Sequence, residues 1–305
     1  MTAGLRYTSE RRELTGNVIS TNPLGVKSVT ATVDSGKTFN KLTWRLAAAY
    51  QITPATLVYL SYNRGFKSGA FNPTALALPA VRPEVLDAYE VGFKTSFLNR
   101  RLRFNAAGFY YDYTDVQIQR FFNGQNGVFN GDKAKIYGFE AELSGSVTPA
   151  LDVNVSYQYL SAKYGTFPTA VIATPRVIGG YAISSGDATG NRTVLAPKSA
   201  LSVGASYRIP AGNGSVVLAG NAYYNSGFFF EPDNVLRQPS YTLFNGSIRW
   251  NIAEEGPYIT VWGRNLSNEV VAASGAIQAY PGGFGLARFA YEPPRTFGVT
   301  IGAKF

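Results

Sequence analysis

The chain ends in the stretch RTFGVTIGAKF, residues Arg295–Phe305, in which apolar residues alternate with small or polar ones. The apolar set is Phe297, Val299, Ile301, Ala303 and Phe305. A period of two residues is typical of a β-strand whose two faces meet different surroundings. The stretch therefore predicts an amphipathic strand that ends in an aromatic side chain.

The same alternation recurs along the chain and predicts an all-β protein. It is clearest in Leu42–Ile52, Tyr89–Phe97, Tyr137–Val147, Leu151–Tyr159 and Leu201–Ile209. We expect about twelve strands, at residues 2–8, 39–52, 56–68, 88–98, 101–119, 133–147, 151–164, 198–209, 215–229, 240–252, 257–270 and 295–305.

The connections between these strands alternate in length. Short turns are expected at residues 53–55, 99–101, 148–150, 210–214 and 253–256. Long loops are expected at residues 9–38, 69–87, 120–132, 165–197, 230–239 and 271–294. An antiparallel up-and-down meander places all the short turns at one end and all the long loops at the other. This asymmetry is typical of transmembrane β-barrels of the outer membrane.

Composition excludes several classes of function. The 305 residues include no cysteine and no histidine, which removes disulfides, thiol nucleophiles and the commonest general base and metal ligand. The formal charge of +9 favours acidic partners in general. The basic residues are spread along the chain, whereas a nucleic-acid face needs a contiguous patch. We therefore predict no catalytic residue, no cofactor, no metal site and no nucleic-acid partner.

The hydrophobic pattern also bears on membrane contact. No apolar run approaches the ~20 residues that a membrane helix needs, so a closed β-barrel is the remaining way to span a bilayer. Apolar faces fit a soluble β-protein equally well if they point inward. Aromatic residues near many strand ends favour the membrane interpretation. It predicts lipid-facing positions at Trp44, Phe93, Phe139, Val155 and Val203.

Several stretches, in this order, resemble the barrel of TonB-dependent outer-membrane receptors. They are YLSYNRGFKSGAFNP (Tyr59–Pro73), RPEVLDAYEVGFKTSF (Arg82–Phe97), VWGRNLSNE (Val261–Glu269) and EPPRTFGVTIGAKF (Glu292–Phe305). The resemblance covers nearly the whole chain. It implies that residues 1–305 form the C-terminal part of a barrel of about 22 strands. We expect the signal peptide and plug domain to be absent from this chain. The alternative is a genuine twelve-stranded barrel that closes on itself.

The resemblance also implies a function. It predicts a receptor in the bacterial outer membrane that takes up a ferric siderophore or a similar scarce solute with energy from TonB, and no enzyme activity. The implied partners are outer-membrane lipid, an iron chelate, the TonB complex through the missing plug, and the barrel-assembly machinery, which would recognise the last strand with Phe305. A passive pore, a non-functional fragment and a soluble β-rich binding protein remain as alternatives.

In this family the substrate binds at the outer loops, so aromatic and cationic residues at loop ends are the candidate ligand contacts. They are Arg120, Phe121, Phe122, Phe228, Phe229, Phe230, Arg237, Tyr280 and Arg288. Aromatic rings combined with arginines suit a catecholate or another anionic iron chelate. The competing interpretation is ordinary loop packing. Glu140 and Glu142, two apart on one strand, form a carboxylate pair that we interpret as charges facing water inside a barrel.

Overall fold

The computed structural model describes every residue except 74–75, 77, 123–124, 132, 281 and 305, and it leaves the side chains of residues 119–122 and 125–126 undescribed. Twelve strands form one sheet: β1 (Thr2–Thr21), β2 (Lys27–Thr53), β3 (Thr56–Lys67), β4 (Glu84–Phe97), β5 (Leu102–Thr114), β8 (Lys133–Ser146), β9 (Leu151–Tyr164), β12 (Ser199–Ala211), β13 (Gly214–Asn225), β16 (Tyr241–Asn251), β17 (Gly256–Arg264) and β20 (Thr296–Lys304). Within the described residues, no helix has the length and apolar character needed to cross a membrane.

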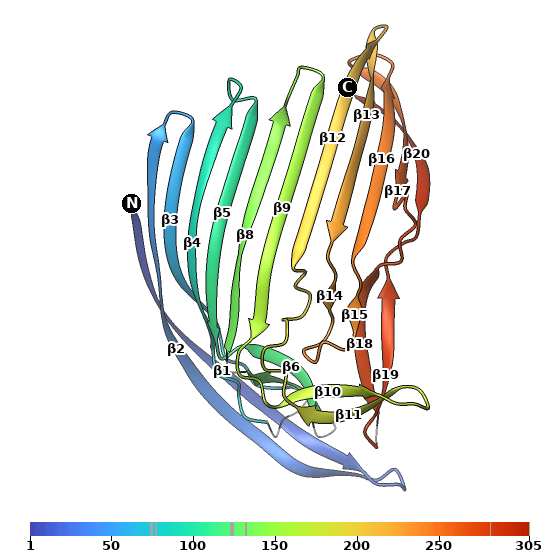
Figure 1. Ribbon diagram of the computed structural model, residues 1–305. Coiled ribbons are helices and arrows are strands. Elements are labelled where there is room, and N and C mark those ends of the chain that lie inside the picture. The colour runs from blue at the N-terminus through green and yellow to red at the C-terminus, as the bar shows by residue number, and fades with distance from the viewer. Residues whose placement is uncertain (74–75, 77, 123–124, 132, 281, 305) are drawn as a thin grey trace.

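The large sheet is an antiparallel meander, as the sequence predicts. Each of the twelve strands pairs with its neighbours in the order in which the chain reaches them. The short turns all lie at one end and the long connections at the other (Figure 1). One short turn, Leu98–Arg100, has three consecutive residues with positive φ, between 51° and 65°. The predicted fold class is confirmed.

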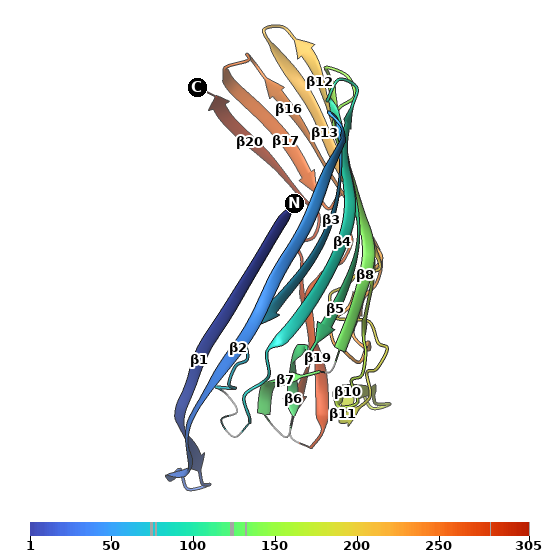
Figure 2. The same cartoon turned by 90° about the vertical axis from the view of Figure 1, so that its left-hand side faces the viewer.

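The sheet does not close on itself. β1 and β20 are its two edges, and no pairing between them occurs in the described chain. Viewed along its edge, the sheet forms an open trough (Figure 2). The alternative of a closed twelve-stranded barrel is therefore wrong for this structure. Its curvature nevertheless gives the sheet a concave and a convex face.

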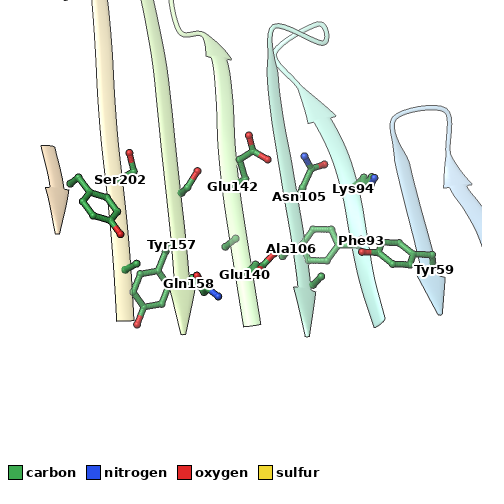
Figure 3. Close-up of a pocket in the computed structure, with 15 residues that line it drawn as sticks. Tyr59, Phe93, Lys94, Asn105, Ala106, Glu140, Glu142, Tyr157, Gln158 and Ser202 are labelled. Carbon is green, nitrogen blue, oxygen red and sulfur yellow. The ribbon is translucent and has the colours of Figure 1, made fainter. Parts of the chain in front are cut away.

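Polar and apolar side chains separate onto these two faces. Tyr59, Lys94, Glu140 and Tyr223 belong to strands from β3 to β13, yet they line one hollow of about 470 Å³ (Figure 3). Only the concave face of a curved sheet lets strands so far apart share a hollow. The alternating apolar set lies on the convex face, where Phe93, Phe139 and Val203 are 37%, 47% and 41% exposed.

On the convex face, four tyrosines lie directly opposite one another across neighbouring strands. We call them the tyrosine row: Tyr62, Tyr89, Tyr110 and Tyr137, on β3, β4, β5 and β8. The row lies at the end of the apolar part of this face that is nearer the long loops. Aromatic rings in this position are typical of the girdle where a transmembrane barrel meets the membrane interface.

The alternation in the final strand has a packing reason on each face. On the concave face of β20, a Cβ at Gly298 would lie 2.2 Å from Trp262 Cζ2, and one at Gly302 would lie 2.5 Å from Tyr258 Oη. Glycine is therefore needed where aromatic side chains of β17 cross β20. On the convex face, Phe297, Val299 and Ile301 are each more than 60% exposed.

The prediction of a loop at residues 9–38 is wrong. β1 and β2 continue as a two-stranded ribbon well beyond the end of β3, because β2 pairs with β3 only from Trp44 onward. Asn22 closes its turn by accepting hydrogen bonds from the Leu24 and Val26 amides. The ribbon is solvated on both sides for much of its length, so its sequence carries no apolar period. Its Gly16 lies against Leu76 of the following loop.

The long connections contain short strands of their own. These are β6 (Gln117–Phe122), β7 (Gln125–Asn130), β10 (Ala170–Pro175), β11 (Tyr181–Gly186), β14 (Phe228–Phe229), β15 (Arg237–Gln238), β18 (Ala272–Tyr280) and β19 (Phe284–Tyr291). β10, β11, β19 and β18 join into a second, four-stranded sheet. Two loops that are far apart in sequence therefore form one structure below the trough (Figure 1).

Candidate functional site

A cavity of about 870 Å³ lies among the long connections. Its described walls come from the loop ends of β5, β8 and β9, the start of β6, strands β10, β11 and β18, and residues 193–194 and 230–232. Tyr113, Gln117, Tyr164 and Gln278 supply polar groups, and Ile118, Ile136 and Ile277 supply apolar surface. A mostly apolar hollow with a few convergent polar groups is the usual form of a small-molecule site.

The turn Glu231–Asn234 is hydrogen-bonded to two strands of the cavity wall, β18 and β10. Glu231 Oε1 accepts a hydrogen bond from the Ile277 amide of β18 at 3.0 Å. Asp233 Oδ2 accepts one from the Ala173 amide of β10 at 2.9 Å. Asn234 has a φ of 60°, a conformation that asparagine adopts more readily than most residues. These contacts tie loops that are distant in sequence into one wall.

Glu231 also gives the cavity its charge. Burial raises the pKa of the Glu231 carboxyl, the Ile277 amide lowers it in part, and the negative charge of Asp233 raises it further. Among the described lining residues, Glu231 is the one carboxylate, and no lysine or arginine is present. The described part of the wall therefore presents a hydrogen-bond acceptor and a negative charge to a ligand.

Another set of contacts fixes the start of β6. The Gln117 amide donates to Glu84 Oε2 at 2.7 Å, and Gln117 Nε2 donates to the Ser68 and Arg82 carbonyl oxygens. Arg82 in turn binds Asp115 Oδ1 through two nitrogens, at 2.8 and 2.6 Å. Asp115 follows the end of β5 and has a φ of 57°, which a β-strand does not allow. β5 therefore ends before residue 119, where the sequence predicted its end.

Two of the predicted ligand contacts, Phe228 and Phe230, form an aromatic cluster with Phe289 at the cavity. Phe230 lines the cavity, and its ring packs edge-on against those of Phe228 and Phe289, with centroids 5.2 and 5.8 Å apart. The Arg192 guanidinium lies 5.4 Å from the centre of the Phe229 ring. Of the nine predicted contacts, only Phe230 belongs to the described cavity lining.

The other predicted contacts lie elsewhere in the loop region. Arg237, Tyr280 and Arg288 are exposed on β15, β18 and β19, and Arg288 donates a hydrogen bond to the lining residue Gln278. Arg120, Phe121 and Phe122 belong to β6, but their side chains lie outside the described residues, as does Phe305. Ligand contact by any of these residues stays a prediction.

No sequence pattern identified Glu231. The predicted contacts were aromatic and cationic loop residues, and a single acidic residue in the EPDN turn has no distinctive pattern. The turn-forming residues Pro232, Asp233 and Asn234 were the available signal, because they indicate a structured turn.

The hollow on the concave face is a second candidate site, and its lining is more polar. Tyr59 Oη donates a hydrogen bond to Glu90 Oε1 at 2.7 Å, and the Lys94 ammonium lies 5.9 Å from the Tyr59 ring centre. Glu140 and Glu142 point into the same hollow from β8, together with Gln158 of β9 (Figure 3). Their position agrees with the interpretation of charges on the inner face. Phe93 and Tyr157, also drawn there, pack on the convex face against Phe104 and Phe139.

A comparison with known families decides what this architecture is. The family described as "TonB dependent receptor-like, beta-barrel" matches residues 1–267. The chain belongs to the TonB-dependent receptor family. Among the solved structures, the ferric yersiniabactin uptake receptor FyuA of Yersinia pestis superposes with a TM-score of 0.77 at 18% identity, over 98% of this chain and 42% of that one. That likeness shows that the open sheet shares its fold with part of a TonB-dependent receptor.

Curated relatives are receptors for iron chelates. The catecholate siderophore receptor Fiu of Escherichia coli K12 is 29% identical over 148 residues, which cover 45% of this chain and 19% of Fiu. The ferrioxamine receptor of Yersinia enterocolitica is 25% identical over 250 residues, which cover 80% of this chain and 32% of that protein. The chain thus spans between about a fifth and a third of the length of these two curated relatives.

Proposed function

We propose that this chain forms the C-terminal part of the barrel of an outer-membrane receptor that takes up a ferric siderophore or a similar scarce solute with energy from TonB. The observation that supports it best is the cavity of about 870 Å³ among the long connections, built at one end of a sheet that belongs to this family. Relatives named as siderophore receptors give the solute class.

The chain's own residues would supply binding and not catalysis. The cavity offers aromatic and aliphatic walls with an acceptor at Glu231, and among the described residues no group of three acidic side chains is arranged to hold a metal ion. Iron in this proposal is cargo that arrives within its chelator. The siderophore groups are therefore what the loops would recognise.

Uptake in cells tests this function. A strain that lacks the gene for this chain should lose accumulation of radiolabelled ferric siderophore in iron-poor medium, and the restored gene should recover it. Deletion of tonB in the complemented strain should abolish uptake again.

The passive-pore alternative gives the opposite result. A pore would transport the labelled solute without TonB and without saturation as the solute concentration rises. TonB-independent, non-saturating entry would therefore contradict the proposal and favour the pore.

A further inference from the structure

The convex face carries a line of charged residues directly beyond the tyrosine row. We call it the charged row: Arg64, Asp87, Asp112, Lys135 and Lys163, each directly opposite the next across β3, β4, β5, β8 and β9. The first pair is neutralised, because Arg64 donates two hydrogen bonds to the two oxygens of Asp87. The row ends in two lysines that face each other.

Lys135 and Lys163 have one carboxylate beside them, Asp112, which lies opposite Lys135 on β5. Residues directly opposite in antiparallel strands have Cβ atoms about 5 Å apart, and like charges in that arrangement destabilise a sheet. Both lysines are exposed, and neither forms an ion pair within the described residues. Asp112 is opposite Lys135 in register, but its Oδ1 is buried without a hydrogen-bond partner.

A third lysine extends this positive charge. Lys133 is exposed two residues beyond Lys135 on the same face of β8. We call Lys133, Lys135 and Lys163 the lysine cluster. Three cations beside one carboxylate form a local site for an anion.

The position of the lysine cluster along β8 and β9 indicates which kind of anion binds there. Alternate residues of β8 toward the long loops are Leu143, Ala141, Phe139, Tyr137, Lys135 and Lys133. On β9 the corresponding series is Val153, Val155, Tyr157, Tyr159, Ser161 and Lys163. Both series pass from apolar through aromatic to cationic side chains. Aromatic residues lie at the membrane interface, so the next row outward lies at the level of the lipid headgroups.

We propose that the lysine cluster is a binding site for the phosphate of an anionic lipid headgroup, in the leaflet on the long-loop side. Lysine binds phosphate as a compact point charge, and three of them around a headgroup would hold it beside β8 and β9. A lipid held there would relieve the repulsion between Lys135 and Lys163. This inference rests on the proposed membrane location.

Native mass spectrometry of the proposed full receptor that contains this chain, purified in a maltoside detergent with equimolar phosphatidylglycerol and phosphatidylcholine, tests the site. We expect the unchanged receptor to retain phosphatidylglycerol in preference. The double variant Lys135→Gln/Lys163→Gln should lose about tenfold or more of that affinity, given the attraction of a surface lysine to anionic lipid. Raising the salt concentration should weaken the preference, because salt screens exposed charges.

Two control variants distinguish an effect of the lysine cluster from a general effect of positive charge on lipid binding. Lys27→Gln/Lys37→Gln removes the same charge from the exposed ribbon of β1 and β2 and should leave the preference intact. Lys135→Arg/Lys163→Arg should retain it, which shows that the positions tolerate substitution. An unchanged preference in the Lys135/Lys163 glutamine variant, an equal loss in the ribbon variant, or full displacement of lipid by millimolar inorganic phosphate would overturn the proposal.

The outcomes also distinguish this inference from the proposed function. Bound phosphatidylcholine without any preference for phosphatidylglycerol would remove the lysine site and leave the membrane location standing. A receptor that remains soluble and compact without detergent and retains neither lipid would contradict both.

Discussion

The ring of Tyr62 stacks on that of Tyr89 with their centroids 4.6 Å apart and their planes 2° from parallel. The two residues are directly opposite on β3 and β4, and Tyr62 Oη donates to Asp87 in the charged row. This contact joins the aromatic and ionic levels of the convex face. On the short-turn side of this contact the convex face is apolar, so the tyrosine row indicates where lipid contact ends.

A charge placed on the apolar convex face, on the short-turn side of the tyrosine row, should destabilise the sheet in a bilayer. Val155 lies on the convex face of β9, whereas Ser144 lies on the concave face of β8. We expect Val155→Arg to cost about 2–4 kcal/mol near the membrane midplane and Ser144→Arg much less, because only the first places a charge in lipid. Urea unfolding of the protein in vesicles measures both. Equal losses would contradict the assignment of the two faces.

Gly298 should be sensitive to one added methyl group. A Cβ there would lie 2.2 Å from Trp262, which must then move and lose its 3.2 Å hydrogen bond from Nε1 to Thr300 Oγ1. We expect Gly298→Ala to cost about 1–3 kcal/mol, as overpacked sites do. Gly4→Ala is the control, because nothing lies within 4 Å of a Cβ at that position. Thermal unfolding and tryptophan fluorescence should both show the difference.

The sequence predicted the large sheet well because most of its strands have one apolar and one polar face. β20 is the clearest case, since its period of two follows directly from lipid on one side and aromatic packing on the other. The ribbon of β1 and β2 escaped this reasoning because water surrounds much of it. Its remaining signal was a run of β-branched residues, Val29–Val33, with only Ala31 interrupting it.

Local sequence patterns could not predict the structures within the long connections, for a different reason. β11 pairs with β19 through Tyr181 and Ala182, whose partners Gly285 and Phe284 are about a hundred residues away. Nothing local specifies such a contact. The sequence singled out Phe230, which lines the cavity, but the cavity wall depends on hydrogen bonds from the Glu231–Asn234 turn. Only the folded arrangement shows that Glu231 approaches β18.

Asn265 should stabilise the long-loop end of β17. It is 7% exposed and has a φ of 49°. Its side chain donates to the Glu269 carbonyl oxygen and accepts from the Glu269 amide, each at 2.9 Å. We expect Asn265→Ala to cost about 1–3 kcal/mol, because it removes two hydrogen bonds that contribute about 0.5–1.5 kcal/mol each. Asn265→Gly loses the same hydrogen bonds but suits the φ, so an intermediate loss in chemical unfolding would separate the two causes.

Glu231 should make the loop cluster sensitive to pH. Its pKa is raised above 4.5 in the fold, mainly by burial, so its favourable contribution to stability is complete below about pH 4.5 and declines as the pH rises through the raised value. The facing titratable groups are Asp233, Tyr113 and Tyr164. Glu231→Gln should remove this dependence, as measured by protease resistance of the β17–β20 connection from pH 4 to 7.

The same variant tests the polarity of the cavity. Because Glu231 is the one carboxylate in the described lining, its removal should strengthen binding of a negatively charged ferric catecholate more than binding of a neutral ferric hydroxamate. Titration of each chelate into the unchanged protein and into Glu231→Gln gives the comparison. Equal changes for the two chelates would show that Glu231 acts on loop structure alone.

The open sheet should prevent this chain from forming a stable monomer alone in a bilayer. β1 and β20 each leave one edge of backbone donors and acceptors unpaired among the described residues. In lipid each such group costs several kcal/mol, and in water such edges promote aggregation. We therefore expect the refolded chain to aggregate or to associate through these edges. Heat-modifiable gel mobility and light scattering in detergent measure this. A compact, heat-modifiable monomer that restores TonB-dependent uptake when it is present in the outer membrane would contradict the expectation.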